Sequence, residues 1–287
     1  MKPINQISIY ILVSLMLASC TTEIPNDINF EPQVFISGAI TDEKEYVTIK
    51  IQRTVPVNNL GNDPINNAQI SLYTKNVSGD RELVTSSFNS AEGIYKSSEM
   101  ITSIVGNTYW IEIQLADGTF FKSDEEVLKE KIIISDVELT YDYNRVTFAD
   151  PVDDANFYLI SLKVIDHQDP DPEKFSKTLG LTNDVLFNGS DKATFDDSYH
   201  LYGTPRNLDV HVSISNLNFN TYQYYLNQLD QYEAQIGIGV EEGTNDIGLL
   251  FLPPPPNLIG NIMNMTTNTR ALGFFGVQNT TKFVKTY

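Results

Sequence analysis

Apolar and polar residues alternate with a period of two through long parts of the chain, and no other feature restricts its fold as strongly. The alternation is clear in residues 47–52, 68–73 and 109–115. Because successive side chains of a β-strand point to opposite faces, each of these segments is predicted to be a strand with one buried face. Further strands are predicted at Ile132–Leu139, Phe157–Ile165, Leu208–Leu217 and Leu272–Phe283.

Turn-forming residues separate these strands at short intervals. Asn58–Pro64, Ser78–Asp80 and Glu92–Gly93 are turn segments rich in Asn, Asp, Gly or Pro. The pair Asp117-Gly118 predicts a hairpin with a type I′ turn, since both residues tolerate positive φ angles. Several short strands with turns at this spacing favour a β-sandwich.

One segment has helical spacing instead. Asn220 is predicted as its N-cap, and the side chains that follow at i, i+3, i+4, i+7 and i+10 are Tyr222, Tyr225, Leu226, Leu229 and Tyr232. This pattern predicts one short amphipathic helix. Its tyrosines, Tyr224 among them, either cover a sheet or offer a stacking surface for sugars or aromatic ligands.

The first twenty residues have the organisation of an export signal. Lys2 precedes an apolar run of about twelve residues, Ile7–Ala18, which is shorter than the ~20 residues that a membrane-spanning helix needs. The run ends in Leu17-Ala18-Ser19-Cys20, which resembles the bacterial lipobox at all four positions. We therefore expect residues 1–19 to be a lipoprotein signal peptide. The alternative is an ordinary secretory signal in which Cys20 is only a small apolar residue.

The lipobox resemblance implies that Cys20 carries the lipid. Diacylglycerol is attached to the thiol as a thioether, and cleavage frees the amine for a further chain such as palmitate. Two or three acyl chains hold a protein firmly at a membrane. Thr21, rather than Asp, follows the cysteine, which favours the outer membrane of the cell envelope. The sequence leaves open whether the protein faces the periplasm or the exterior.

The expected organisation has four parts. Residues 1–19 are the signal peptide, residues 20–31 a polar lipidated tether, residues 32–130 a first β-module and residues 131–287 a second β-rich module with the helix. The charged stretch Lys122–Lys131 is the predicted boundary, or else a solvated loop or edge inside a single domain.

Two resemblances refine this expectation. Residues 32–128, through Ala68–Leu72, Gly93–Tyr95 and Gly106–Tyr109, resemble the transthyretin-like or carboxypeptidase-regulatory-like sandwich, an Ig-like architecture. The expected fold class is therefore mainly β, a transthyretin-like/Ig-like sandwich plus a second β-rich module with one short helix. Such sandwiches contribute architecture and binding surface more often than catalysis.

The second resemblance covers nearly the whole mature chain. The order of lipobox, sandwich, Tyr-rich helix, Gly260-Asn261-Ile262 and Ala271–Phe275 resembles the Bacteroidota outer-membrane lipoproteins called domain of unknown function 4249. Members of that family look like companions of TonB-dependent outer-membrane transporters. The resemblance implies such a partner here, with attachment to the membrane through the acyl chains on Cys20.

Charge and composition exclude several function classes. The 37 Asp and Glu against 19 Lys and Arg give a formal net charge of −18, which disfavours binding to nucleic acid. A single Cys and three His leave little material for a Cys- or His-based metal centre. No Gly-x-Ser-x-Gly, His-Glu-x-x-His, Walker or dinucleotide motif occurs in the sequence. We expect no cofactor and no enzyme, although a carboxylate-based hydrolase needs only a suitable cleft.

One acidic turn could supply oxygen ligands for Ca²⁺. Its candidate ligands are Asp166, Asp169, Asp171 and Glu173. Because their spacing is not that of an EF-hand loop and two prolines stiffen the segment, we expect no metal here.

A proline-rich segment near the C-terminus is the candidate partner surface. Pro253, Pro254, Pro255 and Pro256 preset an extended backbone without donors, which lowers the entropy lost on docking. The predicted surface comprises these prolines with Asn257, Phe274 and Phe275; its alternative is a rigid structural strap. The expected function is a lipid-anchored binding or accessory protein beside a transporter in nutrient uptake, or else a structural or adhesive envelope protein without a small ligand.

Overall fold

A computed structural model describes most of the chain beyond the N-terminal segment. The described residues are 30–56, 59, 61–140, 143–152, 155–168, 175–197, 207–238 and 258–287. The predicted signal peptide and nearly all of the tether lie outside these ranges. Gln33–Tyr287 form one compact unit.

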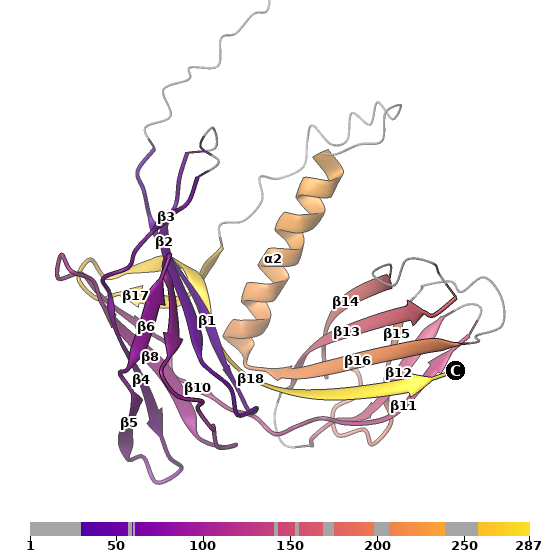
Figure 1. Ribbon diagram of the computed structural model, residues 1–287. Helices are drawn as coiled ribbons and strands as arrows, with labels where there is room; N and C mark the ends of the chain where they lie inside the picture. Colours follow the sequence, from indigo (N-terminus) through magenta and orange to yellow (C-terminus); the bar gives the residue numbers. More distant parts are fainter. Residues whose placement is uncertain are drawn as a thin grey trace, which may run out of the picture. The chain divides into compact units, whose positions relative to one another are not determined.

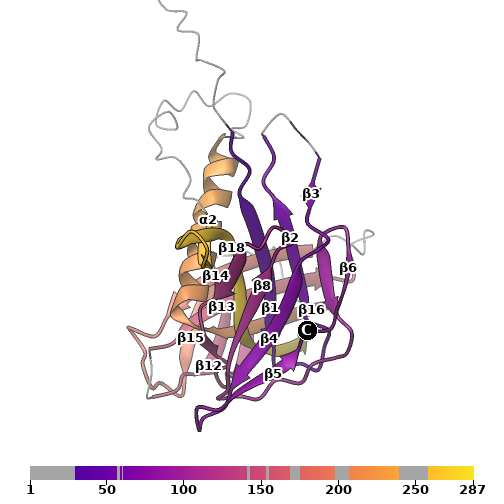
Figure 2. The same cartoon turned by 90° about the vertical axis from the view of Figure 1, so that its left-hand side faces the viewer.

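The first group of strands surrounds one apolar core (Figures 1 and 2). Its hydrogen-bonded order is β5-β4-β8-β9-β17-β18-β1-β2-β7-β6, with β10 paired to β8 and β3 to β2. The strands are β1 (Val34–Thr41), β2 (Thr48–Arg53), β3 (Asp63–Pro64), β4 (Gln69–Lys75), β5 (Arg81–Thr85), β6 (Phe88–Ala91), β7 (Ile94–Ser97), β8 (Thr108–Gln114), β9 (Phe120–Ser123), β10 (Glu126–Val127), β17 (Ile259–Asn264) and β18 (Thr269–Thr286).

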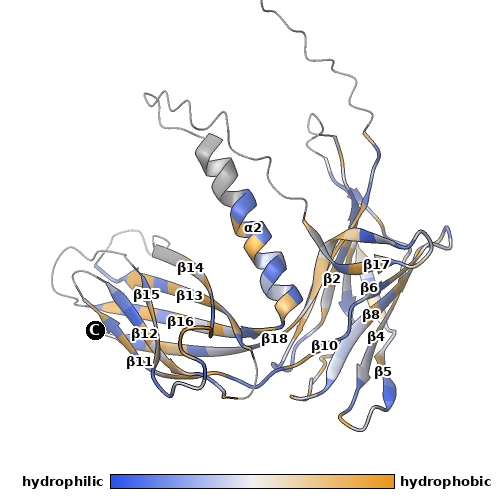
Figure 3. Ribbon diagram, turned by 180° about the vertical axis from the view of Figure 1, so that it is seen from behind, coloured by the Kyte–Doolittle hydropathy of each residue, from blue (hydrophilic) through white to orange (hydrophobic). Residues whose placement is uncertain are grey.

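The second group of strands encloses a separate apolar core. One sheet has the order β11-β12-β15. The other sheet has the order β14-β13-β16-β18, in which only the end of β18 takes part. The new strands of this second group are β11 (Ile133–Leu139), β12 (Asn144–Ala149), β13 (Phe157–Asp166), β14 (Phe175–Asn183), β15 (Ala193–Asp197) and β16 (Leu208–Leu217). Hydrophobic and hydrophilic residues alternate along β12, β13 and most of β16 (Figure 3), so each of these strands turns one face to the core.

A single long strand, β18, belongs to both groups. Residues 272–278 pair in parallel with Phe35–Thr41 of β1, and residues 279–286 pair antiparallel with Asp209–Asn216 of β16. The predicted boundary between residues 130 and 131 is therefore crossed by backbone pairing, since β17 and the first half of β18 complete the sheet of the first module. The division into domains 32–130 and 131–287 stays a prediction.

The charged stretch Lys122–Lys131 is only partly solvated. Glu126 is 3% exposed and Leu128 is fully buried. Downstream, the Asn279 side chain donates to the Lys129 carbonyl and the Asn216 side chain to the Glu130 carbonyl. These two amides fix the chain where it passes from the first group of strands to the second.

The hairpin at Asp117-Gly118 forms, but the predicted type I′ turn there is wrong. Gly118 has a φ of 87°, whereas Asp117 is not among the described residues with positive φ. The Gly118 amide donates to the Leu115 carbonyl, and the Asp117 carboxylate accepts from the Thr119 amide at 2.9 Å, which holds this turn. The conformation that type I′ requires occurs instead at Glu92-Gly93, with φ angles of 52° and 75°.

The predicted helix is α2 (Phe219–Ile238). It begins two residues earlier than expected, so the prediction of Asn220 as N-cap is wrong. The Tyr222 amide donates to the Asn218 carbonyl, and the Asn218 side chain donates to the carbonyls of Val127 and Val277. Asn218 therefore ties the start of the helix to the first group of strands.

The predicted mainly β fold with one helix is confirmed. Strong alternation produced the most accurate boundaries: β16 covers Leu208–Leu217 as predicted, and β4 and β8 differ from the predicted segments by one or two residues. Within the described residues, no helix combines the length and the apolar character that crossing a bilayer requires.

Candidate functional site

Two glycines allow three strands to approach closely at one point. A Cβ atom on Gly260 of β17 would lie 1.7 Å from the Gly273 carbonyl oxygen of β18. A Cβ atom on Gly273, whose φ is 90°, would lie 2.0 Å from the Ile36 carbonyl oxygen of β1. Both positions therefore exclude any side chain, which explains the glycines of the segments Gly260-Asn261-Ile262 and Ala271–Phe275.

The side chain of Asn261, the residue after Gly260, makes hydrogen bonds in place of a missing backbone pairing. The Asn261 side chain donates to the Phe275 carbonyl at 2.9 Å and accepts from the Phe275 amide at 3.0 Å. The pairing of β17 with β18 is irregular at this point, between Ile259 and Met263. The carboxamide thus satisfies two backbone groups that the ladder leaves free.

A buried carboxylate lies beside Asn261. Glu126 of β10 accepts hydrogen bonds from the Thr221 hydroxyl at 2.8 Å and from the side chains of Asn261 at 3.4 Å and Asn218 at 3.5 Å. Burial raises the pKa of Glu126 to about 7, against the opposing effect of bonds from Thr221, Asn261 and the Val277 amide. Glu126 therefore joins β10, β17, β18 and the first turn of α2.

A polar pocket of about 190 Å³ lies beside these buried residues, and Asn261 is part of its lining. The residues that line it are Asp124, Asn220, Gln223, Tyr224, Asn227, Gly260, Asn261 and Arg270. Asn220, Gln223 and Asn227 fall at i, i+3 and i+7 of α2, which places the three carboxamides on one face of the helix. The opposite wall is β17, which contributes Gly260 and Asn261.

The Asp124–Arg270 ion pair forms one side of the pocket. Nη1 of Arg270 lies 2.8 Å from Oδ2 of Asp124, and both side chains are about a third exposed or more. The Asp124 amide also donates to the Asn261 carbonyl at 2.7 Å. Because the two charges cancel, the described lining of this pocket has no net charge.

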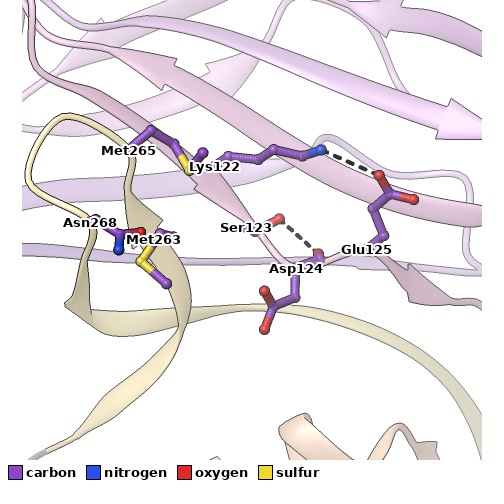
Figure 4. Close-up of a pocket in the computed structure, with 7 residues that line it drawn as sticks. All are labelled: Lys122, Ser123, Asp124, Glu125, Met263, Met265 and Asn268. Atoms are coloured by element: carbon purple, nitrogen blue, oxygen red, sulfur yellow. Dashed lines mark hydrogen bonds and ion pairs between the residues drawn. The ribbon is translucent and has the colours of Figure 1, made fainter.

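A second pocket, of about 390 Å³, shares Asp124 with the first. Lys122, Ser123, Glu125, Met263, Met265 and Asn268 complete its lining (Figure 4). Lys122 and Lys75 both pair with Glu125, at 3.3 and 2.5 Å, so the Glu125 carboxylate is neutralised. We call the two neighbouring pockets together the junction groove.

The aromatic residues near the groove are mostly structural. Tyr224 stacks on Phe274 with ring centroids 4.9 Å apart and an interplanar angle of 21°. Phe157 of β13 packs against Phe219 and Tyr222 at 5.4 and 5.0 Å. Tyr222 and Tyr224 thus cover sheet residues, and Tyr224 also contributes to the polar pocket.

Two residues of the predicted partner surface are in the interior, so that prediction is wrong for them. Phe275 is fully buried in the first core and Phe274 is 5% exposed. The reason is that successive residues of β18 point to opposite faces: Phe275 faces the first core, and Phe274 lies against Tyr224 of α2. Pro253, Pro254, Pro255, Pro256 and Asn257 lie outside the described residues, and their role stays a prediction.

The candidate calcium ligands are not assembled into a site by the described residues. Asp166 is exposed, and its carboxylate accepts from the Gln168 amide at 2.8 Å within its own turn. Asp169, Asp171 and Glu173 lie outside the described ranges, as do the lipobox residues Leu17, Ala18 and Ser19 and the predicted anchor Cys20. Among described residues, no group of three or more His, Cys, Asp or Glu could hold a metal ion.

Tyr158 also has a strongly shifted pKa, and its role is structural. Burial and the hydrogen bond to Asp150 raise the pKa of Tyr158, which is fully buried in the second core. The Asp150 carboxylate also accepts from the Gly189 amide at 2.7 Å, so it holds a loop rather than facing a pocket. Glu126 and this pair therefore serve packing and chain connection.

Solved structures similar to this chain share little of its sequence. A DUF4785 family protein from Legionella pneumophila is 9% identical, with 63% of this chain and 52% of that chain covered and a TM-score of 0.26. Trypsin-activated alpha-2-macroglobulin from Escherichia coli is 11% identical, with 67% and 15% covered and a TM-score of 0.23. The FN1–FN3 domains of chicken CNTN1 are 14% identical, with 65% and 60% covered and a TM-score of 0.26. The chain thus spans about half the length of the Legionella protein and a smaller share of the macroglobulin.

The family comparison covers far more of the chain. No curated protein shows significant similarity. A family model described as Domain of unknown function (DUF4249) matches residues 19–283, a range that contains the close strand crossing, Glu126 and all of the described groove. The chain belongs to the DUF4249 family.

Proposed function

We propose that this protein is a lipid-anchored binding or accessory protein of the outer membrane in Bacteroidota, working beside a TonB-dependent transporter in nutrient uptake. The observation that carries the binding part is the junction groove, whose two pockets of about 190 and 390 Å³ meet at Asp124. The groove lies on strands and a helix that Glu126 and Asn261 hold together, so its walls are pre-organised. Pre-organisation reduces the free energy that a binding site spends on ordering.

The lipobox supports the anchoring part of the proposal. Leu17-Ala18-Ser19-Cys20 has the residue types that lipoprotein processing requires, and the DUF4249 match begins at residue 19, beside Cys20. Acyl chains on Cys20 would hold the protein at the membrane while the polar residues 21–31 provide reach. The resemblance to transporter companions supports the choice of partner.

The described groove supports binding over catalysis. Asp124 is paired with Arg270, and Glu125 with Lys75 and Lys122. Glu126 is buried and bonded to Thr221, Asn261 and Asn218. Each of these carboxylates therefore has a structural partner, whereas a hydrolase needs a carboxyl pair facing its substrate. We propose that the protein is not an enzyme.

Replacing the anchor tests localisation. We expect Cys20→Ala to move the protein from the carbonate-washed membrane pellet into the soluble or uncleaved fraction, because only acyl chains hold it there. Fold and melting temperature should not change, since residue 20 precedes the compact unit Gln33–Tyr287. The measurement is immunoblotting of fractionated cells.

A neighbouring substitution provides the control. Thr21→Ala leaves the four lipobox residues intact and should pellet like the wild type. Equal pelleting of the Cys20→Ala variant and the wild type after the carbonate wash, with the signal peptide removed from both, would contradict the lipoprotein assignment.

A further inference from the structure

The wall of the smaller pocket is a row of carboxamides. Asn220, Gln223 and Asn227 project from one face of α2, and each amide both donates and accepts hydrogen bonds. The apolar positions named for this helix, among them Tyr222 and Leu226, fall on other faces. A half-exposed polar row beside a cavity is not needed to hold the helix, because Phe219 and Tyr222 already pack against Phe157.

The remaining lining restricts the chemistry of a ligand. The Asp124–Arg270 pair adds a fixed acceptor and a fixed donor without net charge. Asn261 forms the floor, but its amide is committed to Phe275 and Glu126. Tyr224, which stacks on Phe274, adds an aromatic ring to the lining, and Gly260 adds backbone. No described lining residue of this pocket is aliphatic, so an apolar ligand would gain little from burial there.

Charge argues against an anionic ligand. Arg270, the only cation in the described lining of this pocket, is already neutralised by Asp124 at 2.8 Å. The whole chain carries a formal charge of −18, which repels phosphates and acidic sugars at long range. The ligand best matched to neutral, mixed donor–acceptor groups and one aromatic ring is itself neutral and rich in hydroxyl groups.

We propose that the junction groove binds a neutral carbohydrate, with one sugar ring held by Gln223, Asn227 and the Asp124–Arg270 pair beside Tyr224. This inference deepens the proposed function by naming the ligand class, and it rests on that function for its biological setting. The pocket of about 190 Å³ offers room for one ring. The adjoining pocket of about 390 Å³ accommodates further units of an oligosaccharide.

Saturation-transfer NMR on the purified chain without residues 1–19 tests the proposal. The probes are glucose, galactose, N-acetylglucosamine, maltotriose and cellotriose, with galacturonic acid and trialanine as the acidic and peptide comparisons. We expect transfer to at least one neutral sugar and none to galacturonic acid or trialanine. Absence of transfer to every neutral sugar, or transfer to the acid or the peptide instead, overturns the proposal.

Variants on the same helix locate the site. Gln223→Ala/Asn227→Ala removes two groups of the groove, and we expect at least tenfold weaker binding of the sugar by titration. Gln228→Ala is the matched control, since Gln228 is exposed and lies outside the pocket lining. Alanine is a strong helix former, so the helix tolerates all three changes. Equal sugar affinity in the double variant and the wild type also overturns the proposal.

Co-purification of the wild-type chain with an outer-membrane transporter is scored separately. Association with a transporter without sugar binding refutes the carbohydrate inference and leaves the accessory role standing. Sugar binding without association refutes the transporter partner and leaves the carbohydrate site standing.

Discussion

Gly273→Ala should abolish or nearly abolish the folded state, with a loss in the free energy of unfolding of about 4 kcal/mol or more. The substitution has two free-energy costs, backbone strain and a steric clash, and they add at this position. Alanine at a φ of 90° is strained, and its Cβ atom would lie 2.0 Å from the Ile36 carbonyl oxygen of the neighbouring strand β1. The oxygen belongs to backbone paired on both sides, so it has no room to move. Denaturant unfolding, or the soluble yield if no folded protein remains, measures the loss.

Gly79→Ala separates the two costs. Gly79 has the same φ of 90°, but nothing lies within 4 Å of its Cβ position. This variant should therefore lose only the backbone term, roughly 1–2 kcal/mol. If Gly273→Ala were as mild as Gly79→Ala, the close approach of β1 and β18 would not be as described.

The second large effect is a pH dependence of stability that originates in Glu126. Its pKa is raised by burial from 4.5 to about 7, so the folded state holds this proton more tightly than the unfolded state. The stabilising contribution is complete below about pH 4.5 and is lost as the pH rises through 7. A difference of about 2.5 pK units corresponds to about 3 kcal/mol.

Glu126→Gln should remove this pH dependence. We expect the unfolding free energy of the variant relative to the wild type to rise by about 3 kcal/mol between pH 4.5 and pH 8. Denaturant unfolding at several pH values measures the change. Parallel pH curves for the two proteins would show that Glu126 does not titrate in this range.

Glu125, the residue before Glu126, provides a control whose stability should change with pH in the opposite direction. The hydrogen bond from Lys75 holds the pKa of Glu125 below its usual range, with Lys122 adding to the effect. A lowered pKa contributes stability that is present at neutral pH and lost as the pH falls. Glu125→Gln should therefore lower stability at neutral pH and lose this effect in acid.

Sequence periodicity predicted the strands well because alternation reflects local geometry. Residues 208–214 alternate strictly, and the predicted boundaries Leu208–Leu217 are those of β16. The same pattern predicted a strand at Leu272–Phe283, but which strands it joins depends on tertiary pairing. Nothing local indicates that one half of β18 meets β1 and the other half meets β16. For the same reason Phe274 and Phe275 were wrongly expected on a surface.

The candidate site was only partly accessible from sequence. From sequence alone, Gly260-Asn261 indicates only a family resemblance, whereas its physical role is a close strand crossing and a side chain that replaces backbone pairing. Glu126 stood in a charged stretch read as a boundary or solvated loop, and its partners Thr221 and Asn261 are 95 and 135 residues away. The carboxamides Asn220, Gln223 and Asn227 have helical spacing in the sequence, but nothing local indicates that β17 lies opposite them.

The central claim, that the protein is an anchored companion of an outer-membrane transporter, is tested most directly by affinity purification from detergent-solubilised outer membranes. An affinity-tagged wild-type chain should retain a TonB-dependent transporter in a near-stoichiometric amount, identified by mass spectrometry. The Cys20→Ala variant, prepared in parallel, should retain much less because it lacks attachment to the membrane. Recovery of the wild-type chain without any transporter, from membranes that contain it, would contradict the account.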